Sequence, residues 1–116
     1  MLQNRRMMRI NDEIKRCLAE IIRLEIRDPR LDSMINILKV KTSVDLEHCI
    51  VYVSVFSGDK KEIIKILNSA AGFIKKMIAE KINLRVTPNF KFVLDDSIEY
   101  SMKINDLLNK IKVLFF

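Results

Sequence analysis

Gly72 is the residue whose surroundings most clearly suggest binding chemistry. It is one of two glycines in the chain, and it follows Ala70 and Ala71 in the middle of a helix-patterned run, 60–84. Glycine inside a helix costs roughly 1 kcal/mol relative to alanine, so a glycine-poor sequence that keeps one there indicates that access to the backbone is needed. Backbone amides at a helix start bind phosphate well. We therefore interpret Gly72 as a candidate contact for a polyanion.

Basic side chains share the side of this helical run on which Gly72 falls. At about 100° per residue, an apolar stripe follows one side of the run. The opposite side carries Gly72 with four polar residues: Lys61, Lys65, Asn68 and Lys76. A helix that breaks at Gly72 would offer the free amides of a new helix start, with Lys75 and Lys76 one turn on. In an unbroken helix the glycine would only relieve a close contact, and the helical phase does not decide between the two.

A second basic surface is predicted on the first amphipathic segment, 5–26. Five arginines fall on one edge of its helical wheel: Arg5, Arg9, Arg16, Arg23 and Arg27. Acidic residues at helix spacing from several of them allow the interpretation of a solvated face. The fork of arginine also matches phosphate geometry, so the same edge is a candidate phosphate-binding ridge, and the two interpretations are compatible. Lys39 and Lys41 share one face of the first predicted strand.

Residues that could support catalysis or bind a metal are not arranged for either. Asp95 and Asp96 are neighbours at a strand end, so their carboxylates would point in different directions. His48, the sole histidine, has no nucleophile or metal ligand near it in the sequence. Cys17 and Cys49 have no Cys-x-x-Cys spacing and are most simply buried small hydrophobes in a reducing compartment. We expect a protein that is not an enzyme and that has no metal or cofactor.

Length and composition predict one domain with a modest core. The chain has 116 residues, of which 49% are hydrophobic and 31% charged, and its formal net charge is +6. The positive balance favours a polyanionic partner, because bound lysines and arginines release phosphate counterions. The first ten residues contain no apolar leader core, and no apolar run approaches the ~18 residues of a membrane span. We expect an unprocessed, soluble, cytoplasmic protein.

The elements that would position these residues follow from periodicity and turn signals. The first helix ends at Asp28-Pro29, because a residue before proline is pushed out of the helical region. Alternating runs at 34–44 and 49–56 are joined by a short connection and predict an antiparallel hairpin. Asp59 begins the helical run, a third strand at 90–94 joins the sheet after that crossover, and a final amphipathic helix follows Asp96. The order predicts a small α+β domain.

This order resembles the class II KH domain, whose Gly-x-x-Gly loop binds the RNA backbone. The chain has no Gly-x-x-Gly, but Ala70-Ala71-Gly72 is similar to the Ala-x-Gly variant of the bacterial ribosome-binding factor A family. Segments 26–31, 84–88 and 92–97 also resemble that family's Asp-Pro-Arg, Leu-Arg-x-x-Pro and Phe-x-x-Asp-x-Ser stretches, and 44–46 with 51–55 resemble its hairpin. The similarity spans nearly the whole chain.

The resemblance implies a class II KH-like fold with a three-stranded sheet, in one RNA-binding domain spanning 1–116. We expect the last residues, 112–116, to form a flexible tail. The resemblance also implies a monomeric assembly factor that binds the free or immature 30S subunit, assists late maturation of 16S rRNA including its 5′ end, supports growth in the cold and leaves with help from a maturation GTPase. The matching motifs place RNA contact at Arg30, Ala70, Ala71, Gly72, Lys75 and Arg85. Charge mapping adds the five arginines and Lys39, Lys41, Lys61, Lys65 and Lys76.

A different class of function is also compatible with the first segment. Its basic amphipathic pattern, together with the apolar tail at 113–116, is typical of a protein-interaction module or a membrane-surface protein. Vesicle binding without a preference for small ribosomal subunits would favour that alternative.

Overall fold

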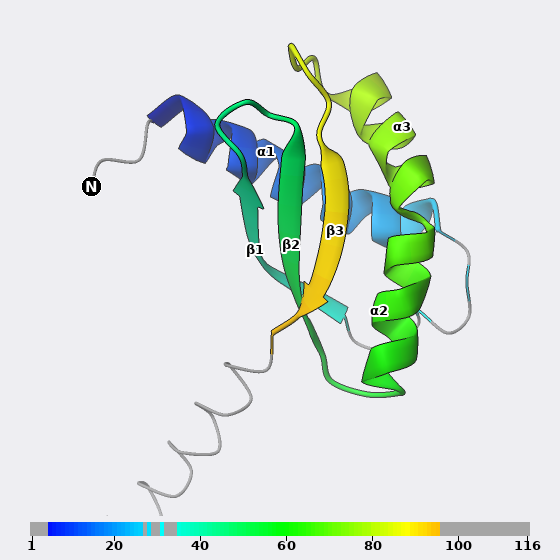
Figure 1. Ribbon diagram of the computed structural model, residues 1–116. Helices are drawn as coiled ribbons and strands as arrows, with labels where there is room; N and C mark the ends of the chain where they lie inside the picture. The colour runs from blue at the N-terminus through cyan, green and yellow to red at the C-terminus, as the bar shows by residue number, and fades with distance from the viewer. Residues whose placement is uncertain (1–4, 27, 29–30, 32–34, 96–116) are drawn as a thin grey trace, which may run out of the picture.

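The computed structural model describes residues 5–26, 28, 31 and 35–95, which form three helices and a three-stranded sheet (Figure 1). The elements in chain order are α1 (Arg5–Leu24), β1 (Ile35–Thr42), β2 (His48–Val55), α2 (Lys60–Ser69), α3 (Ala71–Lys81) and β3 (Asn89–Leu94). The predicted α+β order is confirmed. The predicted final helix after Asp96, the tail, Arg27 and Arg30 lie outside the described residues.

The sheet has the strand order β1-β2-β3. β1 and β2 are antiparallel, which confirms the predicted hairpin, and β3 is parallel to β2. Parallel neighbours need a long crossover, and here α2 and α3 provide it. The Asp59 side chain accepts a hydrogen bond from the Glu62 amide at 3.2 Å, so the predicted cap begins α2.

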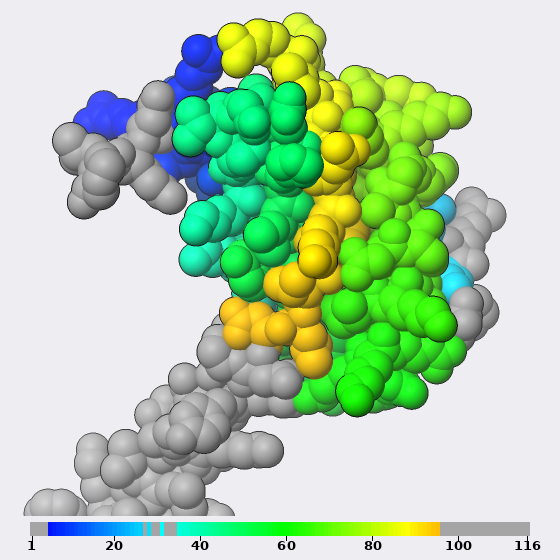
Figure 2. All heavy atoms as spheres, viewed as in Figure 1, coloured from blue at the N-terminus to red at the C-terminus, as the bar shows by residue number. Residues whose placement is uncertain are grey.

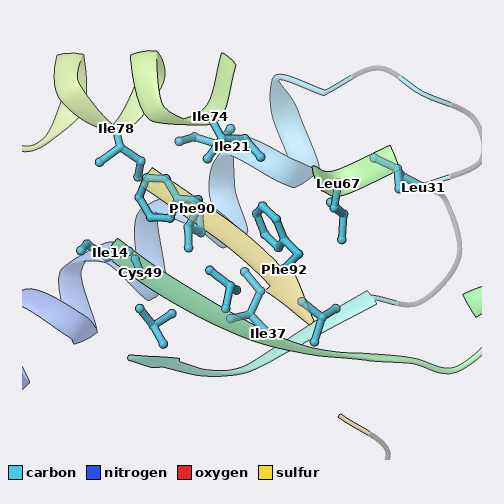
Figure 3. Packing of buried hydrophobic residues seen from close by; sticks show 14 of the residues in the cluster. Ile14, Ile21, Leu31, Ile37, Cys49, Leu67, Ile74, Ile78, Phe90 and Phe92 are labelled. Atoms are coloured by element: carbon cyan, nitrogen blue, oxygen red, sulfur yellow. The ribbon is translucent and has the colours of Figure 1, made fainter. Parts of the chain in front are cut away.

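The three described helices cover one face of the sheet, and none of these three lies on the other face. In Figure 1, α1 crosses behind the strands and α2 and α3 run beside β3. Ile14, Leu18 and Ile21 of α1 are fully buried. Figure 3 shows how such side chains from the helices meet Phe90 and Phe92 of β3 in one apolar core. Burial of this apolar surface holds the helices and the sheet together.

A β-bulge in β1 decides which face of the sheet its lysines occupy. The pairing with β2 shifts between Ile37 and Lys39, so Leu38 is an extra residue in the ladder. Strand side chains alternate between faces, and one extra residue reverses the alternation. Ile37 and Val40 are both buried, whereas Lys39 and Lys41 are exposed on the face that the helices leave open.

A polar contact fixes α1 against the end of β1. The Asn11 Oδ1 atom accepts hydrogen bonds from the Thr42 amide at 3.2 Å and from the Thr42 hydroxyl at 2.6 Å. Thr42 is buried, so these bonds satisfy polar groups that water does not reach. Within the described part of the chain, no helix combines the length and apolar character needed to cross a membrane.

Candidate nucleic-acid interface

The helical run is divided at Ala70, the single residue between α2 and α3. Its backbone, with φ −89° and ψ 1°, leaves the helical region. Its amide still bonds to the Ile66 carbonyl at 3.0 Å, while its own carbonyl accepts the Ile74 amide at 2.9 Å. The interpretation of an unbroken helix is therefore wrong. The break also lies two residues before Gly72, not at it.

Gly72 is the second residue of α3 and is exposed. Among the described glycines, positive φ is found at Gly58 (92°) and not at Gly72. A Cβ atom placed on Gly72 would have no heavy atom within 4 Å apart from the adjoining backbone of its own helix. Neither backbone conformation nor crowding therefore requires glycine at this position, and its effect is to leave the backbone bare.

The first turn of α3 begins with backbone donors that α3 itself does not pair. The amides of Ala71, Gly72 and Phe73 would need acceptors that lie before the helix begins. Ala70 stands at the N-cap position and supplies no side-chain hydrogen bond, and the first turn has no acidic residue. A helix start carries a partial positive charge of roughly half an elementary charge. These amides therefore form a binding position suited to an anion.

The predicted basic face remains on one side of the two helices. Lys61, Lys65, Gly72 and Lys76 are all exposed, and Lys75 is half-buried. The buried residues opposite them, Ile63, Leu67, Ala70 (partly buried), Ile74 and Ile78, keep the spacing of three and four across the break. We call the exposed side, made of Lys61, Lys65, Gly72, Lys75 and Lys76, the break face.

Asn68 connects the break face to the sheet. Its side chain donates to the Phe92 carbonyl at 3.0 Å and accepts from the Phe92 amide at 2.8 Å. β3 is an edge strand, so these bonds satisfy backbone groups that have no strand beside them. Lys75 Nζ similarly donates to Asn89 Oδ1 at 2.9 Å, at the start of β3. The sequence interpretation placed Asn68 only on a solvated side, although an asparagine inside a helix is a signal for such a bond.

Phe73 is a second residue that sequence reasoning passed over. It lies in the first turn of α3 and is 45% exposed, although it is a large hydrophobic residue. An exposed aromatic ring in the first turn of a helix can stack on a nucleic-acid base. The signal was present in the sequence, because Phe73 lies off the apolar stripe while following Gly72 directly.

The other predicted contacts lie on separate surfaces. Arg5, Arg9, Arg16 and Arg23 are exposed on α1, and the first three line a shallow hollow together with Asp12 and Glu13. Lys39 and Lys41 lie on the open face of the sheet, which the view in Figure 2 shows from the front. Because α1 and the core lie behind that sheet, the α1 arginines and the two lysines point away from each other. Arg85 is exposed in the connection between α3 and β3.

The cysteines are not poised for chemistry. Burial raises the pKa of the Cys49 thiol to about 11, against a smaller lowering by a hydrogen bond from Thr42. Burial is also the largest cause that raises the pKa of Cys17. Both thiols therefore stay protonated at neutral pH, and a protonated thiol is a poor nucleophile and metal ligand. Among the described residues, no three histidine, cysteine or acidic side chains are grouped closely enough to hold a metal ion.

Comparison with known proteins relates this arrangement to one family. The family model of ribosome-binding factor A matches residues 6–108. The ribosome-binding factor A of Clostridium botulinum strain Eklund 17B is 46% identical over 114 residues, which cover 96% of this chain and 98% of that protein.

Solved structures agree with this relationship. The crystal structure of ribosome-binding factor A from Thermus thermophilus superposes with a TM-score of 0.70 at 26% identity, covering 76% of this chain and 94% of that one. A homology model of the Thermus thermophilus factor, fitted into a cryo-electron microscopy map of its 30S complex, superposes with a TM-score of 0.62 at 25% identity. That match covers 74% of this chain and 91% of the other.

Proposed function

The chain belongs to the ribosome-binding factor A family, and on this premise we propose that it binds the 30S ribosomal subunit through 16S rRNA. A relative from Thermus thermophilus has been fitted into a map of its 30S complex, which supports the proposal. In this proposal the chain acts as one RNA-binding domain without catalytic activity of its own.

The observation that carries the proposal is the uncapped start of α3 on the break face. The first three amides of a helix without a side-chain cap, the bare backbone of Gly72 and the side chains of Lys75 and Lys76 lie within its first two turns. Amides and ammonium groups together bind a phosphate without reading the base. Exposed Phe73 adds an aromatic surface for stacking. The break face is thus suited to a nucleic-acid backbone with an accessible base.

The finer role that we propose is late maturation of the small subunit. The protein would bind immature 30S particles as a monomer in the cytoplasm, assist processing of the 5′ end of 16S rRNA, support growth in the cold and be released with help from a maturation GTPase. By match to the family's motifs, Arg30, Ala70, Ala71 and Arg85 would contact the RNA as well. The exposed arginines of α1 would supply weaker, long-range attraction.

Removing two charges from the break face tests this proposal. The variant Lys65→Gln/Lys76→Gln changes only exposed side chains, so its melting temperature should stay close to that of the wild type. Its affinity for purified 30S subunits should fall, and the slope of log K against log salt should flatten by about 1.5, because two phosphate contacts are lost. Titrations at several salt concentrations measure both.

The matched control removes two exposed lysines from other surfaces. Lys15 lies on α1 and Lys81 at the end of α3, so Lys15→Gln/Lys81→Gln changes the net charge equally. If the control flattens the slope as much as the break-face variant does, only general charge attraction is at work. An unchanged affinity and slope in the break-face variant would remove that face from the mechanism.

The alternative of a membrane-surface or protein-interaction module has less support on α1. Met8 and Leu24 are exposed there, at 49% and 54%, but they stand at opposite ends of the helix. Exposed acidic residues, Asp12, Glu13 and Glu20, interrupt the surface between them and would repel anionic lipid. Sedimentation with anionic vesicles separates the two functions: vesicle binding without 30S preference would overturn our proposal.

A further inference from the structure

The open face of the sheet carries basic and aromatic side chains in two cross-strand rows. Lys41 pairs with Ile50, which pairs with Lys91, and Lys39 pairs with Tyr52, which pairs with Val93. Strands lie roughly 4.8 Å apart and residues of one face roughly 7 Å apart along a strand. Lys39, Lys41 and Lys91 therefore surround Tyr52 and Ile50 within about 10 Å. We call these six residues the open-face patch.

The charge of the open-face patch has one sign. The three strands contain no aspartate or glutamate, and the nearest carboxylates along the chain are Glu47 before β2 and Asp95 after β3, one at each end. Lys39, Lys41 and Lys91 are exposed, and Ile50 is 36% exposed. A patch in which cations surround exposed apolar surface favours a polyanion that also carries flat apolar groups. Single-stranded RNA has both.

Tyr52 is half-buried, and Lys39 reaches its aromatic ring. The Lys39 ammonium lies over the ring, 5.5 Å from its centroid. An exposed cation–π contact of this kind is weaker than the stacking of a base on an aromatic ring. A base can therefore displace the ammonium from the ring, and the freed ammonium, still tethered beside it, can reach a phosphate of the same strand.

The open-face patch is a different surface from the break face. Its residues belong to β1, β2 and β3 and point away from the helices, whereas the break face lies on α2 and α3 beside the edge of β3 (Figures 1 and 2). Asn68, bonded to Phe92, marks the border between them. The 21 residues at the end of the chain, 96–116, carry three lysines against three acidic residues, so their charge does not complement a purely basic patch.

We propose that the open-face patch binds a second single-stranded segment of RNA, with a base stacked on Tyr52 and phosphates on Lys39, Lys41 and Lys91. The inference rests on the proposed function for the identity of the polyanion. RNA held on the break face would cross the edge of β3 before it reached this patch, so the two surfaces would bind neighbouring segments of unpaired RNA. Binding through both surfaces would therefore require that both segments are single-stranded.

The test uses the full chain and a fluorescein-labelled oligouridine of twelve nucleotides. Tyr52→Leu keeps apolar volume but removes the ring, so the affinity should fall about tenfold, while Tyr52→Phe should keep it within about twofold. Lys41→Gln/Lys91→Gln changes only exposed charges and should flatten the salt slope by about 1.4. Amide NMR shifts induced by the oligonucleotide should include Ile50, Tyr52 and Val93.

Other outcomes would overturn the inference. Shifts confined to 70–76, or equal affinities for Tyr52→Leu and the wild type, would restrict RNA to the break face. Equal binding of polyglutamate would identify a surface for an acidic protein instead. Binding of 30S subunits by wild type and by Lys65→Gln/Lys76→Gln is measured in parallel. If the proposed function is wrong, the wild-type protein will not bind 30S subunits. If only this inference is wrong, the wild type will still bind 30S subunits, but its affinity for oligouridine will not depend on Tyr52.

Discussion

A methyl group added at Gly72 would project into open space, because an ideal Cβ there has no heavy atom within 4 Å apart from the adjoining backbone of its own helix. The backbone is not left-handed either, so alanine fits the conformation. Glycine at such a position lowers the free energy of unfolding relative to alanine, chiefly because it gives the unfolded chain more conformational freedom. A residue that lowers stability without a conformational need is explained by access, here of a phosphate to the bare amides of α3.

The variant Gly72→Ala separates stability from binding. We expect the free energy of unfolding to rise by about 0.5–1 kcal/mol, because the new methyl group meets no obstacle and the unfolded chain loses freedom. We expect its affinity for 30S subunits to fall, because the methyl group stands where the RNA backbone approaches. Urea denaturation and subunit titration measure the two effects. A variant that is more stable and binds equally well would show that the glycine has no binding role.

At the scale of elements, the break between α2 and α3 and the β3 edge form one unit through Asn68. The two hydrogen bonds to Phe92 hold the last turn of α2 against an edge strand whose outward backbone groups have no strand partner. Ala70 is then free to leave the helical region without a side-chain cap. The position of the α3 start relative to the sheet therefore depends on a helix side chain.

Asn68→Ala should destabilise the protein by about 1–2 kcal/mol, because both bonds to Phe92 are lost and the backbone groups of β3 must pair with water. The Phe92 amide should exchange with deuterium faster than in the wild type. Ser69→Ala is the matched control, since the Ser69 hydroxyl bonds only within its own helix, to the Ile66 carbonyl. Equal losses in the two variants would mean that Asn68 does not hold the edge.

The same elements show how far periodicity could predict the site. Ile63, Leu67, Ala70, Ile74 and Ile78 keep the helical spacing across the break, so the exposed basic face could be predicted while the position of the break could not. Periodicity left open whether the helix breaks at all, because the conformation that Ala70 adopts is open to any residue. The bulge at Leu38 was also not predictable, since Lys39 and Lys41 share a face whether or not it reverses that face.

At the scale of the whole molecule, three surfaces of its described part carry groups of basic side chains: the outward side of α1, the break face and the open-face patch. The sheet and core separate the first from the last, so one straight duplex cannot contact both. An irregular RNA with exposed single strands can follow the break face and the sheet together. A folded ribosomal RNA provides such a surface, which is why the charge distribution suits a subunit better than bulk duplex.

Sedimentation of the full chain through a sucrose gradient with 30S, 50S and 70S particles tests the central claim most directly. At physiological salt we expect the protein to travel with free 30S subunits, and the Lys65→Gln/Lys76→Gln variant to shift toward the top of the gradient. The Lys15→Gln/Lys81→Gln control should stay with the subunits. Equal association with all three particles, or none with 30S, would contradict the account.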